Sequence, residues 1–526
     1  MCGFFLSLHQ ENEKLFKKNA NFLKLGHRGP DEYKFFYFNK KFYFEDKKPE
    51  TLKHNFFGFF NRLSIRGLKS NKQSQPIKIN DHIILIYNGE IYNCDYLKKK
   101  FSLNSDAKED SALLSEGIKK FGIYFVEYLD GMFSLCLIDL KLNKISFCRD
   151  KFGIKPLFYY YDKDNLILAS EIKIIVDYLG KNQIEFEEEY FKQILKNKTS
   201  CTSELTPFKK IYRSETGRII EANIKELNLK KMRQISTQKN YTDPDFNNEN
   251  LKLFLDKDFI RYQISDRQTG LLLSSGVDSN FLALNFCKND EKFTYGFIED
   301  EKLNEIKYLN NLRHKKLNYF KVTSNEIQSF FIRFCNLSYE IEDNFGSGIQ
   351  FGLYEFIAKK NVNIKVMFSG QGSDEMSLGY DAFLFKYLED LIDSQDYLRI
   401  YKIRKILKSD LYKKKINDLI EKKVIKNFKL KSILGFLKRI NYKKLIKEFL
   451  KRKTIKNFPK LHEFFLYRIN ERLKTLLRWE DLSSMHFSIE TRLPYLSLNY
   501  YNLINSLNIE KFFINKGNKS FLRNIL

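Results

Sequence analysis

The chain has 526 residues, of which 43% are hydrophobic and 16% aromatic, so it can bury more than one core and global disorder is excluded. No run of about 18 apolar residues occurs, and polar residues come too early for a signal peptide. The seven cysteines are odd in number and contain no CxxC pair, which argues against a disulfide framework or zinc site and favours a cytoplasmic location.

The first candidate for chemistry is Met1-Cys2-Gly3. A thiol attacks as the thiolate, so it needs a base. If Met1 is removed, the α-amino group of Cys2 supplies that base, because its usual pKa is about 7.7–8.0. The motif therefore predicts an N-terminal nucleophile, and an ordinary second residue is the alternative.

Residues 2–190 are predicted to form a sheet-rich domain. Its expected strands are short apolar or aromatic runs separated by turn signals: Phe35–Phe38, Phe56–Phe60, Ile83–Tyr87, Met132–Ile138, Lys144–Cys148 and Leu166–Ala169. One helix is expected at about Asp110–Phe121. Another strand pair is expected near 209–221, within a connecting segment that runs from 191 to 249.

A series of short motifs follows Cys2 along this domain. They are His27-Arg28-Gly29-Pro30-Asp31, Arg62-Leu63-Ser64, Gln75-Pro76, Asn88-Gly89-Glu90-Ile91-Tyr92-Asn93, Asp110 and Arg149–Leu157. Their order and spacing closely resemble the class II glutamine amidotransferase domain of glutamine-dependent asparagine synthetases. The resemblance implies a four-layer αββα fold of the N-terminal-nucleophile hydrolase type.

The resemblance also implies roles in binding and cleaving glutamine. Cys2 would attack the side-chain amide, and Asn88 with the backbone N–H of Gly89 would form the oxyanion hole. Arg62 would pair with the α-carboxylate, which suits its planar guanidinium. Glu90 and Asp110 would hold the α-ammonium group. Arg149–Leu157 would be structural, shaping a turn near the domain interface.

Residues 250–526 follow a different pattern. Buried strands are expected at Gly270–Leu273, Phe293–Phe297 and Val362–Phe368, each flanked by helical stretches. Such alternation predicts an α/β domain with a parallel sheet and helices on its faces.

The run Leu271–Ser279 places a small-residue turn between a strand and a helix. Backbone N–H groups in such a turn can approach phosphate, and the helix N-terminus favours an anion. The motif resembles the pyrophosphate loop of ATP pyrophosphatases, although Ser275 replaces its first glycine. ATP and pyrophosphate are therefore expected to contact Leu273, Ser274, Ser275, Gly276, Asp278 and Ser279.

A third motif, Phe368–Glu375, follows another expected strand. Ser369 and Gly370 are further candidates for phosphate contacts. Asp374 and Asp278 are candidate Mg²⁺ ligands, because hard cations prefer carboxylate oxygens; helix capping is the alternative for both. Asparagine synthetases usually carry an acid where this chain has Gln371. Either the base lies elsewhere in this chain, or Gln371 recognises a different acceptor by hydrogen bonds.

Near the C-terminus, Arg478–Leu496 resembles a late helix and turn of the same family. Lys519 matches a lysine that stabilises the leaving pyrophosphate.

Residues 422–460 carry 15 lysine and arginine residues against one acid, Glu448, within a basic helical insertion expected at about 400–460. A solvated helix explains this charge, and peripheral contact with a membrane or another anionic surface is the alternative. Nucleic-acid binding is not expected, because no reader motif accompanies the charge.

Three functions are compatible with these motifs. The first is an asparagine synthetase that uses glutamine, aspartate, ATP and Mg²⁺. The second keeps the chemistry but amidates another carboxylate, such as a sugar uronate of a surface polysaccharide. The third is a non-catalytic binding protein, against which the retention of Cys2, Asn88 and Lys519 argues. A homodimer is kept as an open option.

Overall fold

A computed structural model describes most of the chain. The described residues are 2–9, 21–39, 41–47, 56–67, 75–106, 109–197, 203–235, 248–286, 293–298, 317–394, 396–406, 413–415, 417–418, 458–506, 519 and 522–523. The chain forms two compact units. The first contains Met1–Lys239, Leu255–Gln371 and Lys474–Tyr500, and the second contains Asn240–Phe254, Gly372–Leu473 and Tyr501–Leu526.

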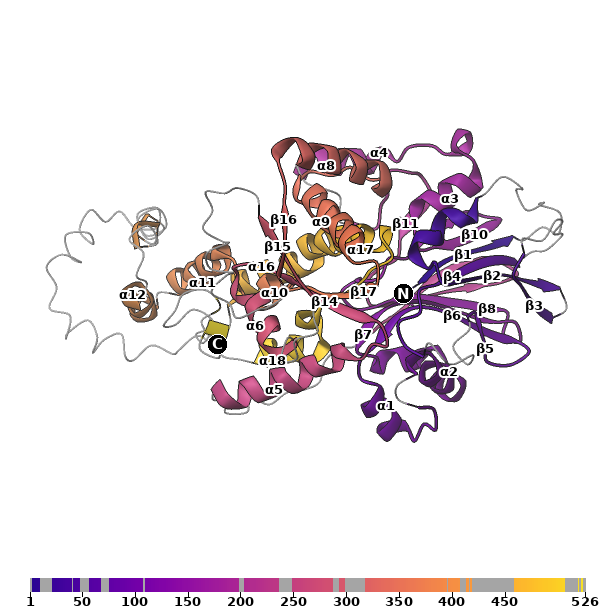
Figure 1. The fold of residues 1–526 in the computed structure, drawn as a ribbon, viewed down its shortest axis with the longest axis horizontal. Coiled ribbons are helices and arrows are strands. Elements are labelled where there is room, and N and C mark those ends of the chain that lie inside the picture. The colour runs from indigo at the N-terminus through magenta and orange to yellow at the C-terminus, as the bar shows by residue number, and fades with distance from the viewer. Residues whose placement is uncertain are drawn as a thin grey trace, which may run out of the picture. The chain divides into compact units, whose positions relative to one another are not determined.

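Two antiparallel sheets dominate the N-terminal part of the first unit (Figure 1). The first sheet has the order β11(Ile211–Arg213), β9(Phe158–Tyr161), β10(Asn165–Ala169), β1(Cys2–His9), β4(Phe56–Arg62), β2(Glu32–Asn39) and β3(Lys41–Glu45). The second has the order β13(Leu229–Gln234), β12(Arg218–Asn223), β8(Lys144–Arg149), β7(Gly131–Asp139), β6(Ile83–Ile91) and β5(Ile77–Lys78).

Helices cover the outer faces of these sheets. α1(Cys94–Phe101), α2(Asp110–Phe121) and η3(Ile123–Tyr128) pack on the second sheet through a core that includes Leu97 and Leu113. η1(Phe22–Arg28) and α3(Ile172–Leu179) pack on the first sheet through Phe22 and Ile175. A separate core, which includes Phe4, Leu6 and Ile86, fills the space between the sheets. Figure 1 shows the resulting α, β, β, α layers.

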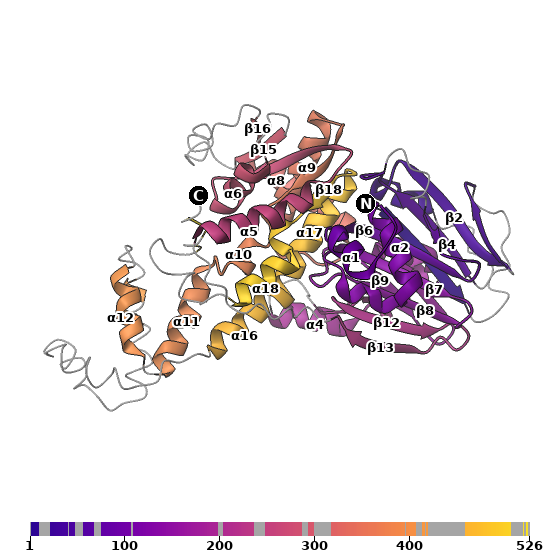
Figure 2. The same cartoon turned by 90° about the horizontal axis from the view of Figure 1, so that it is seen from below.

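The two sheets extend beyond the residues predicted for this domain. β11 and β12 fall within the segment that the sequence assigns to a connection, yet β11 pairs with β9 and β12 pairs with β8. β13 then adds an edge strand, visible beside β12 in Figure 2. The sequence of β13 is mostly exposed and polar, so its pattern alone does not mark a strand. η4(Lys181–Gln183) and α4(Glu188–Asn197) lie between α3 and β11 in the chain.

The third sheet has five parallel strands and belongs wholly to the first unit. Its order is β16(Leu317–Lys321), β15(Phe293–Ile298), β14(Gln268–Leu273), β17(Ile364–Phe368) and β18(Glu490–Arg492). The helices connected with it are α5(Asn248–Ile260), η5(Arg261–Gln263), α6(Val277–Phe286), α8(Ser324–Ser338), α9(Gly346–Lys360) and α17(Leu473–His486). The parallel sheet predicted after residue 250 is thus present, and β16 and β18 are strands that the sequence did not predict.

The order in which strands are added to this parallel sheet reverses between β14 and β17. β15 and β16 extend the sheet on one side of β14, and β17 and β18 extend it on the other. In open α/β sheets, ligands bind beyond the carboxyl ends of the strands at such a switch point. The two serine- and glycine-containing motifs of the sequence follow β14 and β17, so they meet at this position.

The second unit is helical in its described part. It includes α10(Ser373–Met376), α11(Asp381–Asp393), α12(Tyr397–Ile406), α16(Pro459–Tyr467) and η6(Arg468–Arg472). Phe383 and Phe464 pack with ring centroids 5.0 Å apart, which joins α11 to α16. η7(Pro494–Leu496) and α18(Leu498–Ser506) follow β18.

Two features expected from the sequence lie outside the described residues. They are most of the basic segment, at 422–457, and the part of the connecting segment at 236–247. None of the described helices combines the length and apolarity needed to cross a bilayer.

Candidate functional site

Cys2 is the first residue of β1, and β4 and β10 flank that strand. Cys2 is buried, and its backbone N–H donates to Asn88 Oδ1 at 2.8 Å. Burial raises the pKa of the Cys2 thiol, whereas the charge of Arg62 and the backbone N–H of Leu63 lower it. A proton acceptor close to the sulfur is therefore needed to form the thiolate at neutral pH.

Asn88 and Gly89 are brought to Cys2 by β6. Asn88 is fully buried, and its Nδ2 group donates to Ser134 Oγ at 3.5 Å. A Cβ atom on Gly89 would lie 2.1 Å from the backbone oxygen of Met132, so only glycine fits this position of the strand. The sequence-predicted nucleophile and oxyanion-hole residues are therefore neighbours in the structure.

Arg62 pairs with Cys2 across β1 and β4, at the ends of both strands. Its Nη1 atom lies 3.4 Å from Glu32 Oε2. The side chain is only partly buried, and Glu32 is more exposed. This position is compatible with the carboxylate-binding role that the sequence predicts for Arg62.

The two carboxylates predicted to hold the α-ammonium group are buried and already have partners. Asp110 accepts hydrogen bonds from the Tyr87 hydroxyl at 2.8 Å and from the Ile91 backbone at 3.2 Å. Glu90 Oε2 lies 2.8 Å from Arg66 Nε. Burial raises the pKa of Glu90 to about 8, against the lowering effect of Arg66. Glutamine would therefore have to compete with Arg66 for the Glu90 carboxylate.

Arg492 was not assigned a role from the sequence, although it lies within the Arg478–Leu496 motif. Its fully buried guanidinium donates to Glu490 Oε1 at 2.6 Å and to the backbone oxygens of Tyr262 and Ile264, both at 2.6 Å. Its Nη2 atom also lies 3.5 Å from Glu90 Oε2. A strand of the parallel sheet thus reaches the predicted glutamine site.

Arg28 forms a second buried connection and was also missed as a functional residue. Its Nε group donates to the backbone oxygen of Cys2 at 3.4 Å. Its two terminal nitrogens contact Glu171 at 3.2 Å and Asp481, on α17, at 2.8 Å. The arginine of the His27–Asp31 motif is the sequence signal for this link, but its partners are distant in sequence.

The segment Arg149–Leu157 forms a tight turn around Asp150. The Asp150 carboxylate accepts hydrogen bonds from four consecutive backbone N–H groups, those of residues 152–155, at 2.7–3.1 Å. The turn directs Lys155 toward α17, where its Nζ atom lies 3.4 Å from Asp481. These contacts agree with the structural role that was expected for the segment.

The predicted pyrophosphate loop joins β14 to α6. The Ser279 hydroxyl accepts from the backbone N–H of Ser274 at 3.0 Å and donates to its carbonyl oxygen at 3.0 Å, which closes the loop on itself. Ser275 is not among the described residues with positive φ, so serine can replace the family's glycine here without backbone strain. Asp278 lies in the first turn of α6, and its backbone oxygen accepts from the Tyr495 hydroxyl at 2.9 Å.

The loop after β17 lies beside the pyrophosphate loop. A Cβ atom on Gly370 would be 3.4 Å from Asp278 Cβ and 3.5 Å from the backbone nitrogen of Ser279. The backbone N–H of Gln371 donates to Ser369 Oγ at 3.2 Å. The phosphate-contact candidates Leu273–Ser279 and Ser369–Gly370 are therefore brought together, with Gln371 at the end of the second loop.

Asp374 and Lys519 meet within the second unit, although they are far apart in sequence. Lys519 Nζ lies 2.5 Å from Asp374 Oδ1. A Cβ atom on Gly379 would be 2.1 Å from both Asp374 Oδ1 and Lys519 Cε, so the glycine makes room for this ion pair. Nearby, Glu375 Oε1 accepts from the Tyr380 hydroxyl at 2.8 Å and lies 2.8 Å from Arg468 Nη2.

No group of three or more histidine, cysteine or acidic side chains in the described part of the chain is arranged to hold a metal ion. Magnesium, however, is usually bound through one or two carboxylates together with substrate phosphates. Single carboxylates such as Asp278 and Asp374 are compatible with that mode of binding.

The fold and these residues define a protein of two parts. One is a glutamine amidotransferase part, and the other is an α/β part that carries the predicted pyrophosphate loop. A model of the glutamine amidotransferase domain matches residues 1–233, and a model of asparagine synthase matches residues 255–526. The first match ends close to β13, in agreement with the strand pairing.

The chain belongs to the asparagine synthase family and is a glutamine-dependent carbon–nitrogen ligase. A relative from Methanocaldococcus jannaschii is 27% identical over 445 residues, which cover 78% of this chain and 82% of the relative. The glutamine-hydrolyzing asparagine synthetase 2 of Bacillus subtilis is 29% identical and aligns over 62% of this chain and 46% of its own length. The corresponding enzyme of Pongo abelii is 26% identical and aligns over 73% of this chain and 67% of its own length.

A solved structure titled as the allosteric regulatory enzyme of purine biosynthesis aligns with 61% of this chain and 80% of its own length. Its identity is 13% and its TM-score 0.34, which is too low to define a shared fold.

Proposed function

We propose that this chain is a glutamine-hydrolysing asparagine synthetase. It releases ammonia from glutamine at Cys2 and transfers it to the β-carboxylate of aspartate, which ATP activates; the other products are glutamate, AMP and pyrophosphate. The observation that carries the proposal is the contact between the Cys2 backbone nitrogen and Asn88 Oδ1, at 2.8 Å, beside the glycine at position 89. This arrangement joins a nucleophile, its base and an oxyanion hole.

The glutaminase half-reaction follows from this geometry once Met1 has been removed. The α-amine of Cys2 then donates one N–H to Asn88 Oδ1, which leaves its lone pair available to take the thiol proton. The sulfur attacks the amide carbon, and the amide nitrogen of Asn88 and the N–H of Gly89 stabilise the oxyanion. Ammonia leaves with a proton from the α-ammonium group, and water then hydrolyses the thioester to glutamate.

The synthetase half-reaction is assigned to the loops after β14 and β17. The backbone N–H groups of Ser274–Ser279 and of Ser369–Gly370 would bind the phosphates of ATP at the switch point of the parallel sheet. Lys519 would balance charge on the leaving pyrophosphate. Asp278 and Asp374 are each proposed as ligands of Mg²⁺, which when bound would neutralise phosphate charge.

The acceptor is assigned as aspartate because the relatives from B. subtilis and P. abelii are named asparagine synthetases. Gln371 motivates a second acceptor, because an amide cannot take a proton as a carboxylate can. A sugar uronate is therefore included among the acceptors to be tested.

An acceptor screen tests the proposal. The purified chain is incubated with glutamine, ATP and Mg²⁺ together with aspartate, a uronate or no acceptor, and AMP, pyrophosphate and amide products are measured. Among these samples, only the one that contains aspartate is expected to form an amide product, which is asparagine. Pyrophosphate release only with the uronate would move the activity to the second acceptor, and folded protein that hydrolyses no glutamine would contradict both assignments. Intact-mass analysis should show that Met1 is absent.

A further inference from the structure

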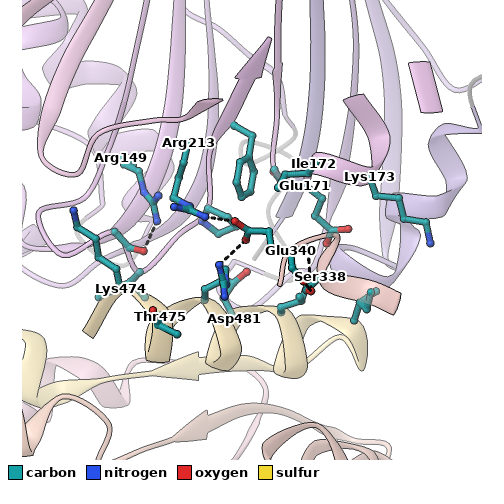
Figure 3. A pocket seen from close by; sticks show the side chains of 18 of the residues that line it. Arg149, Glu171, Ile172, Lys173, Arg213, Ser338, Glu340, Lys474, Thr475 and Asp481 are labelled. Carbon is teal, nitrogen blue, oxygen red and sulfur yellow. Dashed lines mark hydrogen bonds and ion pairs between the residues drawn. The ribbon is translucent and has the colours of Figure 1, made fainter. Parts of the chain in front are cut away.

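A cavity of about 60 Å³ lies in the first unit between the N-terminal sheets and α17. Figure 3 shows Arg149 and Arg213 projecting into it from strands β8 and β11, and Lys474, Thr475 and Asp481 projecting from α17 on the other side. The proposed glutaminase and nucleotide sites do not use this cavity. Among its lining residues, Arg28 connects it with Cys2, through the hydrogen bond to the backbone oxygen.

Cations outnumber acids in the lining of this cavity. The basic residues are Arg28, Arg149, Lys173, Arg213, Lys474 and Arg478, and the acidic ones are Glu171, Glu340 and Asp481. All three acids are already paired: Glu171 and Asp481 bind Arg28, whereas Glu340 binds both Arg213 and Arg478. Arg478 has a further acidic partner in Glu342, which lies outside the lining. The lining itself does not neutralise the positive charge that remains.

Arg149 is the basic residue of the lining that lacks an ion pair most clearly. The residue is only 6% exposed, and no carboxylate in the described part of the chain lies within ion-pair distance of it. One terminal nitrogen donates to the backbone oxygen of Gly153, but the Nε group is buried and has no partner among the described residues. Burial lowers the pKa of Arg149 to about 10, and the charge of Arg213 acts in the same direction, whereas the nearby charges of Asp150, Asp481 and Glu340 oppose this shift only in part. A buried cation of this kind is costly unless an anion compensates it.

Thr475 provides a second unsatisfied polar group on the opposite wall. Its residue is 2% exposed, and its Oγ1 atom has no hydrogen-bond partner among the described residues. A hydroxyl can donate to an oxyanion, as can the guanidinium of Arg149. Two buried donors that face one cavity from different elements form a site for an acceptor-only ligand.

The size of the cavity limits that ligand. One water molecule needs about 10–15 Å³ of such a cavity, so 60 Å³ holds about four to six water-sized groups. A carboxylate or a phosphate has this size, whereas a nucleotide is much larger. We propose that the cavity between β8, β11 and α17 binds a small oxyanion, a carboxylate or inorganic phosphate, through Arg149 and Thr475.

Calorimetric titration of the full chain with phosphate, and separately with acetate, tests this site at constant ionic strength set with chloride. Saturable binding of at least one oxyanion is expected, and Arg149→Gln should weaken it at least tenfold. Thr475→Val keeps the side-chain volume and removes the hydroxyl, so it should weaken binding even if Arg149→Gln does not fold. Lys192→Gln, on exposed α4, is the control and should leave binding unchanged.

The phosphate and acetate arms identify the source of the oxyanion, because a site for one can exclude the other by charge and shape. Binding of neither ion to the wild-type chain would overturn the proposal and leave the cavity to water. Binding that survives both variants but disappears when ATP is added would belong to the nucleotide loop and would also overturn it. The readout is binding, so it does not depend on the proposed synthetase reaction.

Discussion

Arg492 Nη2 lies 3.5 Å from Glu90 Oε2, so β18 of the parallel sheet and β6 of the glutaminase sheets share a buried ion pair. The backbone oxygen of Arg492 also accepts from the N–H of Ser369 at 3.0 Å. One residue thus contacts both the predicted glutamine site and the loop assigned to the nucleotide. The two proposed half-reactions therefore have one buried residue in common.

Arg492→Gln is expected to raise the KM for glutamine at least tenfold, because Glu90 loses one of its two positive neighbours. Removing one partner of a buried ion pair also costs about 3–5 kcal/mol of stability, so the melting temperature should fall. Arg492→Lys is the matched control, since it keeps the charge but not the hydrogen-bonding fork. An unchanged KM for glutamine in folded Arg492→Gln would show that this pair has no part in glutamine binding.

Cys2→Ala is expected to abolish the use of glutamine and to leave synthesis from added ammonium salt within a few-fold of the wild type. The thiol is the only group assigned to attack glutamine, and the nucleotide loops do not depend on it. Product formation with each nitrogen source is the measurement. Loss of both activities in a folded variant would contradict separate sites.

Gly89→Ala should reduce glutamine hydrolysis by about 10²–10³-fold, because the new Cβ would overlap the Met132 oxygen and displace an oxyanion-hole N–H. Gly26→Ala is a matched control: a Cβ atom added there would meet nothing within 4 Å in the described part of the chain, and little change is expected. Glutaminase kcat measured for both variants provides the comparison. Equal rates would remove Gly89 from the oxyanion hole.

Asp374→Asn is expected to reduce ATP-dependent pyrophosphate release by at least tenfold while glutamine hydrolysis continues. The carboxylate that lies 2.5 Å from Lys519 Nζ is then replaced by a neutral amide that neither fixes the lysine nor suits Mg²⁺. Lys519→Gln should produce the same selective loss. Normal pyrophosphate release in either variant would exclude that residue from the synthetase step.

Glutamine binding should weaken as the pH falls below about 8. Burial raises the pKa of Glu90 to about 8, and only the ionised carboxylate can hold the α-ammonium group. The Kd for glutamine of the Cys2→Ala variant, measured by calorimetry, should rise by up to about tenfold for each pH unit below 8. A Kd that stays constant between about pH 6 and 8 would contradict the role of Glu90.

The raised pKa of Glu90 also makes the free energy of unfolding depend on pH. The folded pKa of Glu90 is above its usual value of 4.5, so the folded chain binds more protons between these two values. The contribution of Glu90 to the free energy of unfolding is therefore largest below pH 4.5 and declines as the pH rises toward 8.

The sequence by itself determined the features that depend on local pattern and motif spacing. The run Leu271–Ser279 predicts a strand, a loop and a helix, and these are β14, the loop and α6. Cys2, Asn88 and Gly89 were identified as one set because their spacing matches a family motif. Local pattern could not show β13 as a strand, because its mostly polar side chains are exposed and its pairing with β12 is what makes it one.

Only the tertiary structure decided which charges share a buried site. Arg28 and Asp481 are 453 positions apart in sequence, and no local pattern connects them; they pair because α17 packs beside η1. The position of Arg149, whose guanidinium has no ion pair with a described carboxylate and keeps a buried Nε group without a partner among the described residues, is likewise set by the packing of remote segments. Ion pairing in a low-dielectric interior depends on distances of a few ångströms, which are set when remote segments pack together.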